Sequence, residues 1–372
     1  MRGSGNAPRP HRRRPRPVGR HLAGSVARQA RPRDRPRTHH RHSSRARGSC
    51  RRSRSNTSRH GGHRVIFTLT PNPAVDITYA VPRLHVGESH RVSITGTHAG
   101  GKGLNVAGVL ACMSVEHVAI APVGEGHRSF FEEDAAQRGV RLRVVESPVT
   151  TRRSIAVYSS DGLATVLNEQ GSPQPPQVWE EMTEIVRTSC RPGDVFTVSG
   201  SLPPSTSDEA IVSLCTAAAD AGAELVVDGR GRWVNEVLEA TPAFLKPNES
   251  EAASMTGITD PLQAAQALVD AGAWASLVSR GADGLILVTS TGRVIEARPR
   301  TPGAGNATGA GDALTAAISA GLDGTPRDEV DWPEVLRVGV AWSAAAVRQT
   351  VAGVIDRADV ESLLDDVDIK EH

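Results

Sequence analysis

The sequence has 372 residues, and although 43 Lys and Arg nearly balance 41 Asp and Glu, the charge is divided unevenly. Residues 1–64 hold 20 Arg, no Lys and one acid, Asp34, so that 65–372 carries 23 basic and 40 acidic residues, a net charge of −17. No run of about 18 apolar residues and no apolar segment near the N-terminus occurs, which argues against a membrane span and a secretory signal.

The composition also bears on disulfides, zinc sites and nucleic-acid binding. The four Cys are widely spaced and form no CxxC pair, which excludes a disulfide framework and a zinc site and indicates a reduced, cytoplasmic protein. Aromatic residues make up only 3% of the chain, too few for a platform on which single-stranded nucleic acid stacks.

The first 64 residues are mainly Arg, Pro, Ser, Gly and His, so we predict that they are disordered. Three interpretations stay open: an arm that binds nucleic acid or another polyanion, an organellar transit peptide, and translation from a codon upstream of the true start. The missing apolar face argues against a transit peptide. We favour the third, because the first predicted strand begins abruptly at Val65, and we expect no nucleic-acid partner.

From Val65 onward, buried strands alternate with helices. Short apolar runs predict strands at 65–69, 118–123, 194–199, 224–228, 243–245 and 276–279. Apolar spacing and capping residues predict helices at 105–113, 208–221, 249–255, 261–271 and 313–320. Repeated β-α alternation indicates an α/β fold, a parallel central sheet with helices on both faces, in one domain over 65–372.

Two stretches break this alternation. Residues 75–98 and 150–168 alternate between polar and apolar side chains, which is typical of half-exposed antiparallel strands. We expect them to form a small β-sheet that projects from the main sheet and acts as a lid.

A glycine-rich segment, 303–312, leads into the helix predicted at 313–320. Glycine lets the backbone approach a ligand closely, and a helix N-terminus offers free N–H groups, so the segment suits an anion such as a phosphoryl group. Asp312 has two interpretations, an N-cap of the helix or a general base that accepts a hydroxyl proton. The segment is not a dinucleotide fingerprint, because Leu314 stands where the third Gly belongs.

A second glycine loop, 99–105, also opens a helix. It is either a flexible turn or a clamp in which the backbone lies against a sugar and Lys102 or Asn105 reaches its hydroxyls or phosphate. Only three of the 43 basic residues are Lys, so a Lys here suggests a need for a compact point charge. Asp76 follows the first strand and is either a turn cap or a ligand of sugar hydroxyls.

Two further segments follow strands in the second half of the chain. Residues 245–251 end one strand and start a helix, so Asn248 and Glu251 either cap the helix or contact nucleotide phosphates and Mg²⁺-bound water. Residues 279–284 form a tight turn that by itself predicts only a hairpin between 276–279 and 285–288.

Taken together and in this order, the segments resemble the ribokinase-like (PfkB) carbohydrate kinases over 65 to about 360. The resemblance is greatest to the branch of 1-phosphofructokinases and tagatose-6-phosphate kinases, which have similar openings and loops. The matching segments are Thr68-Leu69-Thr70-Pro71-Asn72-Pro73-Ala74-Val75-Asp76, Gly100-Gly101-Lys102-Gly103-Leu104-Asn105, Val198-Ser199-Gly200-Ser201-Leu202-Pro203 and Leu245-Lys246-Pro247-Asn248. In this branch the chain typically starts at the first strand.

The resemblance implies ATP- and Mg²⁺-dependent phosphorylation of a sugar phosphate, with fructose 1-phosphate as the expected acceptor. It implies that Asp312 is the catalytic base and that the backbone of Gly309, Ala310 and Gly311 forms the anion hole. The sugar phosphate is expected to contact Asp76, Gly101, Lys102, Asn105 and Arg152. ATP is expected to contact Asn248, Ser279, Gly281 and Gly284, with Glu251 organising Mg²⁺ indirectly. The small sheet resembles the family's lid, which often doubles as a homodimer interface.

Two departures from the family pattern affect these expectations. Residues 302–306 are richer in glycine than the usual strand before the anion hole, which puts that strand and a monovalent-cation site in doubt. Ser154 stands where fructose-1-phosphate enzymes often have Asn, so a tagatose-6-phosphate kinase stays an alternative. A non-catalytic regulator that binds sugar phosphates is the alternative of another class, against which the intact Gly309–Asp312 segment argues.

Overall fold

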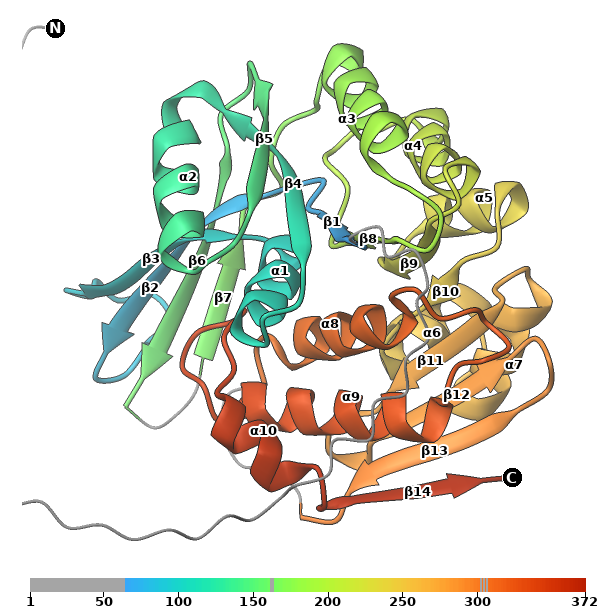
Figure 1. Ribbon diagram of the computed structural model, residues 1–372. Coiled ribbons are helices and arrows are strands. Elements are labelled where there is room, and N and C mark those ends of the chain that lie inside the picture. Colours follow the sequence, from blue (N-terminus) through green and yellow to red (C-terminus); the bar gives the residue numbers. More distant parts are fainter. Residues whose placement is uncertain (1–63, 161–163, 302, 304, 306) are drawn as a thin grey trace, which may run out of the picture. The chain divides into compact units, whose positions relative to one another are not determined.

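The computed structural model describes residues 64–160, 164–301, 303, 305 and 307–372 (Figure 1). The predictions about the Arg-rich extension fall outside these residues and stay predictions. The α-helices are α1 Lys102–Cys112, α2 Arg128–Gln137, α3 Pro176–Ser189, α4 Asp208–Asp220, α5 Arg232–Ala240, α6 Glu249–Thr256, α7 Pro261–Asp270, α8 Ala310–Leu322, α9 Trp332–Val347 and α10 Arg357–Leu363. The strands are β1 Ile66–Leu69, β2 Ala74–Val81, β3 Ser93–Gly100, β4 His117–Gly124, β5 Leu142–Ser147, β6 Arg152–Ser159, β7 Ala164–Asn168, β8 Val195–Ser199, β9 Glu224–Asp228, β10 Phe244–Leu245, β11 Ala275–Ser279, β12 Leu285–Thr289, β13 Val294–Pro299 and β14 Val367–Glu371.

Within the described part of the chain, ten strands form the main sheet, in the order β14-β13-β12-β11-β10-β9-β8-β1-β4-β5. Neighbours from β5 to β11 pair in parallel, and the β11–β12 hairpin starts an antiparallel extension that continues through β13 to β14. Helices α3, α4 and α5 lie on one side of the sheet and α1, α8 and α9 on the other (Figure 1). The predicted parallel sheet, its two helical layers and the hairpin are confirmed.

Alternation of side chains along the strands separates two apolar cores. In β1, Phe67 and Leu69 belong to the core that includes residues of α3, α4 and α7, whereas Ile66 belongs to the core of α1, α8 and α9 on the opposite face. The same alternation holds in β9, where Leu225 and Val227 share the first core and Val226 the second. Because both faces are covered, these strands are apolar throughout, which is why their positions were predictable from short apolar runs.

The small sheet has the order β3-β2-β6-β7 and consists of the two stretches predicted to form the lid. The prediction that its strands are antiparallel is wrong for the central pair, since β2 and β6 run parallel, with Asp76 opposite Ser154. A parallel pair needs a long crossover, and β3, α1, β4, α2 and β5 lie between these two strands in the chain.

Helices α1 and α8 begin three residues earlier than predicted, and both follow a glycine with positive φ. The N-cap of α1 is Gly101, with φ 122°, and the N-cap of α8 is Gly309, with φ 89°. Only glycine adopts such values readily. The interpretation of Asp312 as the N-cap is therefore wrong, because Asp312 is the third residue of α8, in its first turn, and its carboxylate accepts from Asn105 instead.

No strand is assigned to the described residues between 300 and 309, in line with the glycine content there. Among all described residues, no helix combines the length and apolarity needed to cross a bilayer. The cysteines of the described part, Cys112, Cys190 and Cys215, are unpaired. Burial raises the pKa of Cys190 and Cys215 to about 12, so both thiols stay protonated and unreactive near neutral pH.

Candidate active site

A cavity of about 680 Å³ opens where the carboxyl ends of β1, β8 and β9 face the small sheet. Parallel α/β sheets bind ligands at this edge. The lining is mostly polar and comprises Asn72, Asp76, Gly101, Lys102, Asn105, Arg152, Ser154, Asn168, Glu169, Gln170, Ser199, Gly200, Ser201, Leu202, Pro204, Gly229, Arg230 and Glu251. The five residues predicted to contact the sugar phosphate all line this one cavity, and so does Glu251.

Asp76 reaches the cavity from β2, and its carboxylate lies against the backbone of Gly100. A Cβ on Gly100 would stand 2.0 Å from Cγ of Asp76, so only glycine leaves room for this carboxylate. Burial raises the pKa of Asp76 to about 6, and the nearby guanidinium of Arg152 opposes that rise. The interpretation as a simple turn cap is wrong, because Asp76 is a strand residue facing the cavity.

The guanidinium of Arg152 is held in place by backbone carbonyls. Nε donates to the carbonyl of Asn72 at 3.1 Å and Nη1 to the carbonyl of Glu169 at 3.0 Å. These two bonds fix the plane of the side chain at the cavity wall, on strand β6 of the small sheet. An oriented guanidinium of this kind is suited to a phosphate.

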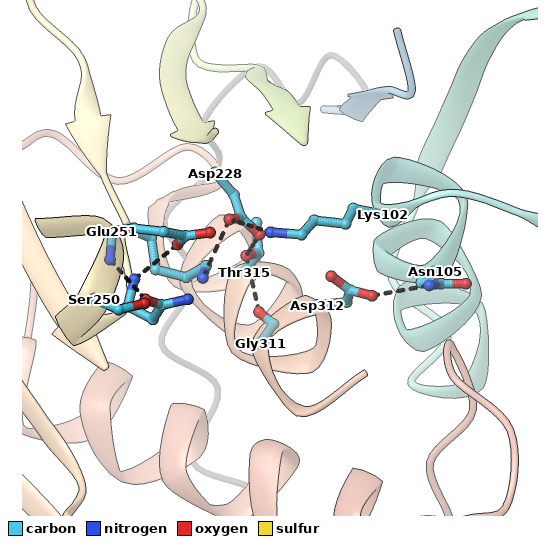
Figure 2. A network of polar contacts seen from close by, with 10 residues as sticks. Lys102, Asn105, Asp228, Ser250, Glu251, Gly311, Asp312 and Thr315 are labelled. Carbon is cyan, nitrogen blue, oxygen red and sulfur yellow. Dashed lines mark hydrogen bonds and ion pairs between the residues drawn. The ribbon is translucent and has the colours of Figure 1, made fainter. Parts of the chain in front are cut away.

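The loop before α1 delivers two side chains toward α8. Lys102 Nζ forms an ion pair with Asp228 Oδ1 at 3.1 Å, and Asn105 Nδ2 donates to Asp312 Oδ2 at 2.8 Å (Figure 2). Burial of the Lys102 ammonium disfavours its charge, yet the carboxylates of Asp228 and Asp312 raise its pKa above the usual value. Lys102 is therefore a fixed cation at the cavity, which excludes the interpretation of this loop as merely flexible.

Asp312 lies just behind the cavity wall, next to Asn105, with 6% of its surface exposed. Burial raises the pKa of its carboxyl to about 6, and the negative charge of Asp228 adds to the rise, while Lys102 opposes it. A carboxylate with a pKa near the working pH accepts a proton more readily than an ordinary Asp. The geometry and the pKa together favour the general-base interpretation.

The residues predicted to form the anion hole lie at the start of α8. The first N–H groups of a helix lack acceptors within the helix, and the helix dipole adds positive potential there. The Ala310 N–H donates to the carbonyl of Ala307 at 3.3 Å, so of the predicted amides this one is engaged. Lys246 also lies beside this helix start, because its ammonium stands 3.7 Å from where a Cβ of Gly311 would be. The same ammonium forms an ion pair with Asp228.

The residues predicted to bind ATP lie together but outside the cavity lining. Asn248 and Ser279 are bridged in parallel at the carboxyl ends of β10 and β11, and Gly281 and Gly284 bound the turn after β11. A Cβ on Gly284 would stand 2.1 Å from the carbonyl oxygen of Ala297, so glycine is required there.

Asn248 and Glu251 form a reciprocal helix cap. The Asn248 side chain accepts from the Glu251 N–H at 2.8 Å, and Glu251 Oε2 accepts from the Asn248 N–H at 3.0 Å. The capping interpretation is thus confirmed, and Glu251 also lines the cavity. In the described part of the chain no three His, Cys, Asp or Glu side chains form a metal cage. The Glu251 carboxylate alone would be enough to hold Mg²⁺, which usually keeps water and phosphate ligands and takes few from protein.

Sequence reasoning missed the centre of this network, Asp228, with its partners Lys246 and Thr315 (Figure 2). Burial disfavours the charge of Asp228, but the ammonium groups of Lys246 and Lys102 hold its pKa below the usual value. A signal for Asp228 was present, because it ends a predicted buried strand at the edge where ligands bind. A signal for Lys246 was its rarity, as one of three Lys in the chain.

Comparison with known proteins finds relatives that match most of this chain. The model of the pfkB family carbohydrate kinases matches residues 70–357. A 1-phosphofructokinase of Escherichia coli (strain K12) is 30% identical over 314 residues, 82% of this chain and 98% of the relative. A 1-phosphofructokinase of Haloferax volcanii is 32% identical over 304 residues, 80% of this chain and 95% of the relative. The tetrameric inhibited form of phosphofructokinase-2 from Escherichia coli has a TM-score of 0.74 at 26% identity, covering 81% of this chain and 98% of that one.

Proposed function

Because the chain belongs to the pfkB family of carbohydrate kinases, with a ribokinase-like fold, we propose that it uses ATP and Mg²⁺ in the cytoplasm to phosphorylate fructose 1-phosphate, which yields fructose 1,6-bisphosphate. The relatives of similar length named 1-phosphofructokinase support this acceptor. The observation that carries the chemistry is the buried Asp312, with a pKa near 6, held by Asn105 at the edge of the polar cavity.

In this proposal Asp312 accepts the proton of the acceptor hydroxyl. The hydroxyl oxygen then forms a bond to the terminal phosphorus of ATP as the bond to the bridging oxygen breaks, and ADP leaves. Negative charge on the transferring group faces the N–H groups of Gly309–Gly311 and the ammonium of Lys102. Preorganised donors of this kind stabilise the transition state without reorganising, and phosphoryl transfer depends mainly on them.

The acceptor would lie between the lid and the main sheet. Asp76 and Asn105 present oxygen and nitrogen to the sugar hydroxyls, and Gly101 lets the backbone approach them. Arg152 faces the existing phosphate from β6. An acceptor with a phosphate at one end and a hydroxyl at the other would be held at both, which orients the hydroxyl toward Asp312.

The donor would lie along the ends of β10 and β11, where Asn248, Ser279, Gly281 and Gly284 gather. Bound Mg²⁺ neutralises charge on the donor phosphates, and Glu251 would hold it through water. The donor and acceptor regions adjoin at Glu251 of α6, which lines the cavity and forms the reciprocal cap with Asn248.

The test measures ADP release with a panel of sugar phosphates, including fructose 1-phosphate and tagatose 6-phosphate. We expect fructose 1-phosphate to have the highest kcat/KM and Asp312→Asn to lower kcat by about 10²- to 10⁴-fold, the usual contribution of a general base. The matched control is Asp220→Asn, the same change at an exposed position in α4.

Each alternative has its own outcome. Preference for tagatose 6-phosphate would replace the acceptor and keep the mechanism. Binding of a sugar phosphate without turnover would favour the regulator, and near wild-type turnover by Asp312→Asn would show that another group is the base.

We further propose that the lid sheet joins two copies of the chain in a homodimer. Cross-strand register places Ile77, Ile155 and Leu167 in one row on the lid face turned away from Asp76. Ile94 lies beside Tyr79 in the next row and is 64% exposed, and Leu167 is 58% exposed. An exposed apolar row of this kind suits burial against a second copy of itself.

Sedimentation velocity tests the dimer, with Leu167→Glu as the variant. We expect this change to yield monomers, while Leu262→Glu, which alters an apolar residue of α7 that is 40% exposed, leaves the dimer intact. A wild-type monomer at micromolar concentration, or a dimer that survives Leu167→Glu, would contradict the proposal.

A further inference from the structure

Asp228 lies at the carboxyl end of β9 and is 1% exposed, yet it touches three polar side chains from three other elements. Its Oδ1 lies 3.1 Å from Lys102 Nζ at the start of α1 and 3.4 Å from Lys246 Nζ just after β10. Its Oδ2 lies 3.2 Å from Thr315 Oγ1 in α8 (Figure 2). The Asp228 carboxylate thus contacts side chains from α1, from α8 and from the residue that follows β10.

The two ammonium groups share a single oxygen, and so they are close neighbours of the same charge. Lys246 is nearly as buried as Asp228, with 4% of its side chain exposed, whereas the Lys102 side chain is 41% exposed toward the cavity. Two ammonium groups this close repel each other, and because Lys246 is buried, solvent screens that repulsion only in part. Asp228 offsets that repulsion and leaves the cluster with one net positive charge beside Gly311.

We propose, on the basis of the function proposed above, that Asp228 is a positioning residue that holds Lys102 and Lys246 side by side at the start of α8 and sets the basicity of Asp312. It does not touch the acceptor. Its effect reaches the reacting atoms through the two lysines and through its charge.

The charge effect follows from the groups close to Asp312. Asp228 accepts from Thr315, which lies three residues after Asp312 on the same face of α8, and Asn105 donates to Asp312 directly. The other charged neighbours are Lys102 from α1 and Lys246 from the end of β10. The anion of Asp228 disfavours a second anion at Asp312, whereas both ammonium groups favour it. Loss of Asp228 therefore makes Asp312 a stronger acid and a weaker base, while loss of Lys246 does the reverse.

The experiment compares Asp228→Asn with Lys246→Met, which nearly preserves side-chain length. In the ligand-free protein, the ¹³C signal of the Asp312 carboxyl is followed against pH and assigned by its absence in Asp312→Asn. We expect the midpoint to fall by about one pH unit in Asp228→Asn and to rise in Lys246→Met, a size typical of the loss of one nearby charge. Asp220→Asn should leave it unchanged.

With substrates, the acid limb of the plot of kcat against pH should move to lower pH in Asp228→Asn and to higher pH in Lys246→Met. At its optimum pH, Asp228→Asn should have a kcat more than 10-fold below that of wild type. A residue that only supports the fold would lower activity equally at every pH and leave both midpoints in place, which would overturn the inference. If Asp228→Asn does not fold, the rise in Lys246→Met decides by itself, and an unchanged midpoint there refutes the charge coupling.

The ligand-free titration separates this inference from the proposed function. Absence of sugar-phosphate turnover by wild type would refute the function, yet the midpoints of Asp312 would still move as stated. Turnover by wild type with unmoved midpoints would refute the role of Asp228 and leave the function standing.

Discussion

Asp312→Asn should stabilise the protein while it removes the base, and the structure determines both the size and the pH dependence of that gain. The substituted amide keeps the shape of the side chain and retains an oxygen that accepts from Asn105 Nδ2, now 2.8 Å from Asp312 Oδ2. What changes is the charge, which wild type must hold at a position that is only 6% exposed.

The magnitude follows from the pKa of Asp312, which burial, and after it Asp228, raises from 3.8 to about 6. The native state binds this proton more tightly than the unfolded state, so wild-type stability falls as pH rises from about 4 to about 6 and then levels off. At about 1.4 kcal/mol for each pKa unit, the loss approaches about 3 kcal/mol. The amide does not titrate. The free energy of unfolding of Asp312→Asn should therefore exceed that of wild type by about 1.5 kcal/mol near pH 5 and by about 3 kcal/mol at pH 8.

Urea denaturation of wild type and Asp312→Asn from pH 5 to pH 8 measures this difference directly. Asp220→Asn serves as control, since its exposed carboxylate should show no pH-dependent gain. A difference that stays constant with pH, or a wild type that is more stable at pH 8, would refute the argument that Asp312 is ionised at an energetic cost in the native state.

Three more predictions concern the acceptor and metal sites. Gly100→Ala places a Cβ on the Asp76 carboxylate and should raise the acceptor KM at least about 10-fold without changing the KM for ATP, as steady-state kinetics will report. Arg152→Ala should raise the acceptor KM roughly 10- to 100-fold, whereas Arg153→Ala, at an exposed position next to it, should leave KM as it is. Glu251→Gln retains an acceptor for the Asn248 N–H, so its thermal stability should equal that of wild type. Because the variant lacks the negative charge, half-maximal activity should need several-fold more Mg²⁺. An unchanged Mg²⁺ dependence would show that Glu251 does not help to hold the metal.

Much of the fold was predictable from local patterns. The strands β1, β8, β9, β10 and β11 lie within one residue of their predicted bounds, because strands covered on both faces are short, continuous apolar runs. Helices α4 and α7 begin at the predicted residues, where Ser207 and Asp260 cap them through their side chains. A cap and an apolar stripe are properties of neighbouring residues, and they act within one turn.

Other elements were missed because their cause lies outside the segment. Strands β13 and β14 pair with each other at the edge of the sheet, although three helices separate them in the chain. Their strand character therefore depends on a partner that is distant in sequence. The parallel pairing of β2 with β6 depends on where the intervening chain places the second strand, which periodicity along either strand does not contain. The early start of α8 depends on the positive φ of Gly309, which one glycine among several in that segment does not reveal.

The tertiary structure decides where the positive charges of the acidic body come together. The sequence by itself determined an acidic body, its glycine loops and the residues that match a carbohydrate kinase. Only the fold decided that Lys102 and Lys246, 144 positions apart, meet on Asp228 beside the start of α8. Local sequence sets backbone preference and side-chain type, whereas the potential at a buried point is a sum over all nearby charges, and those distances exist only once the chain has folded.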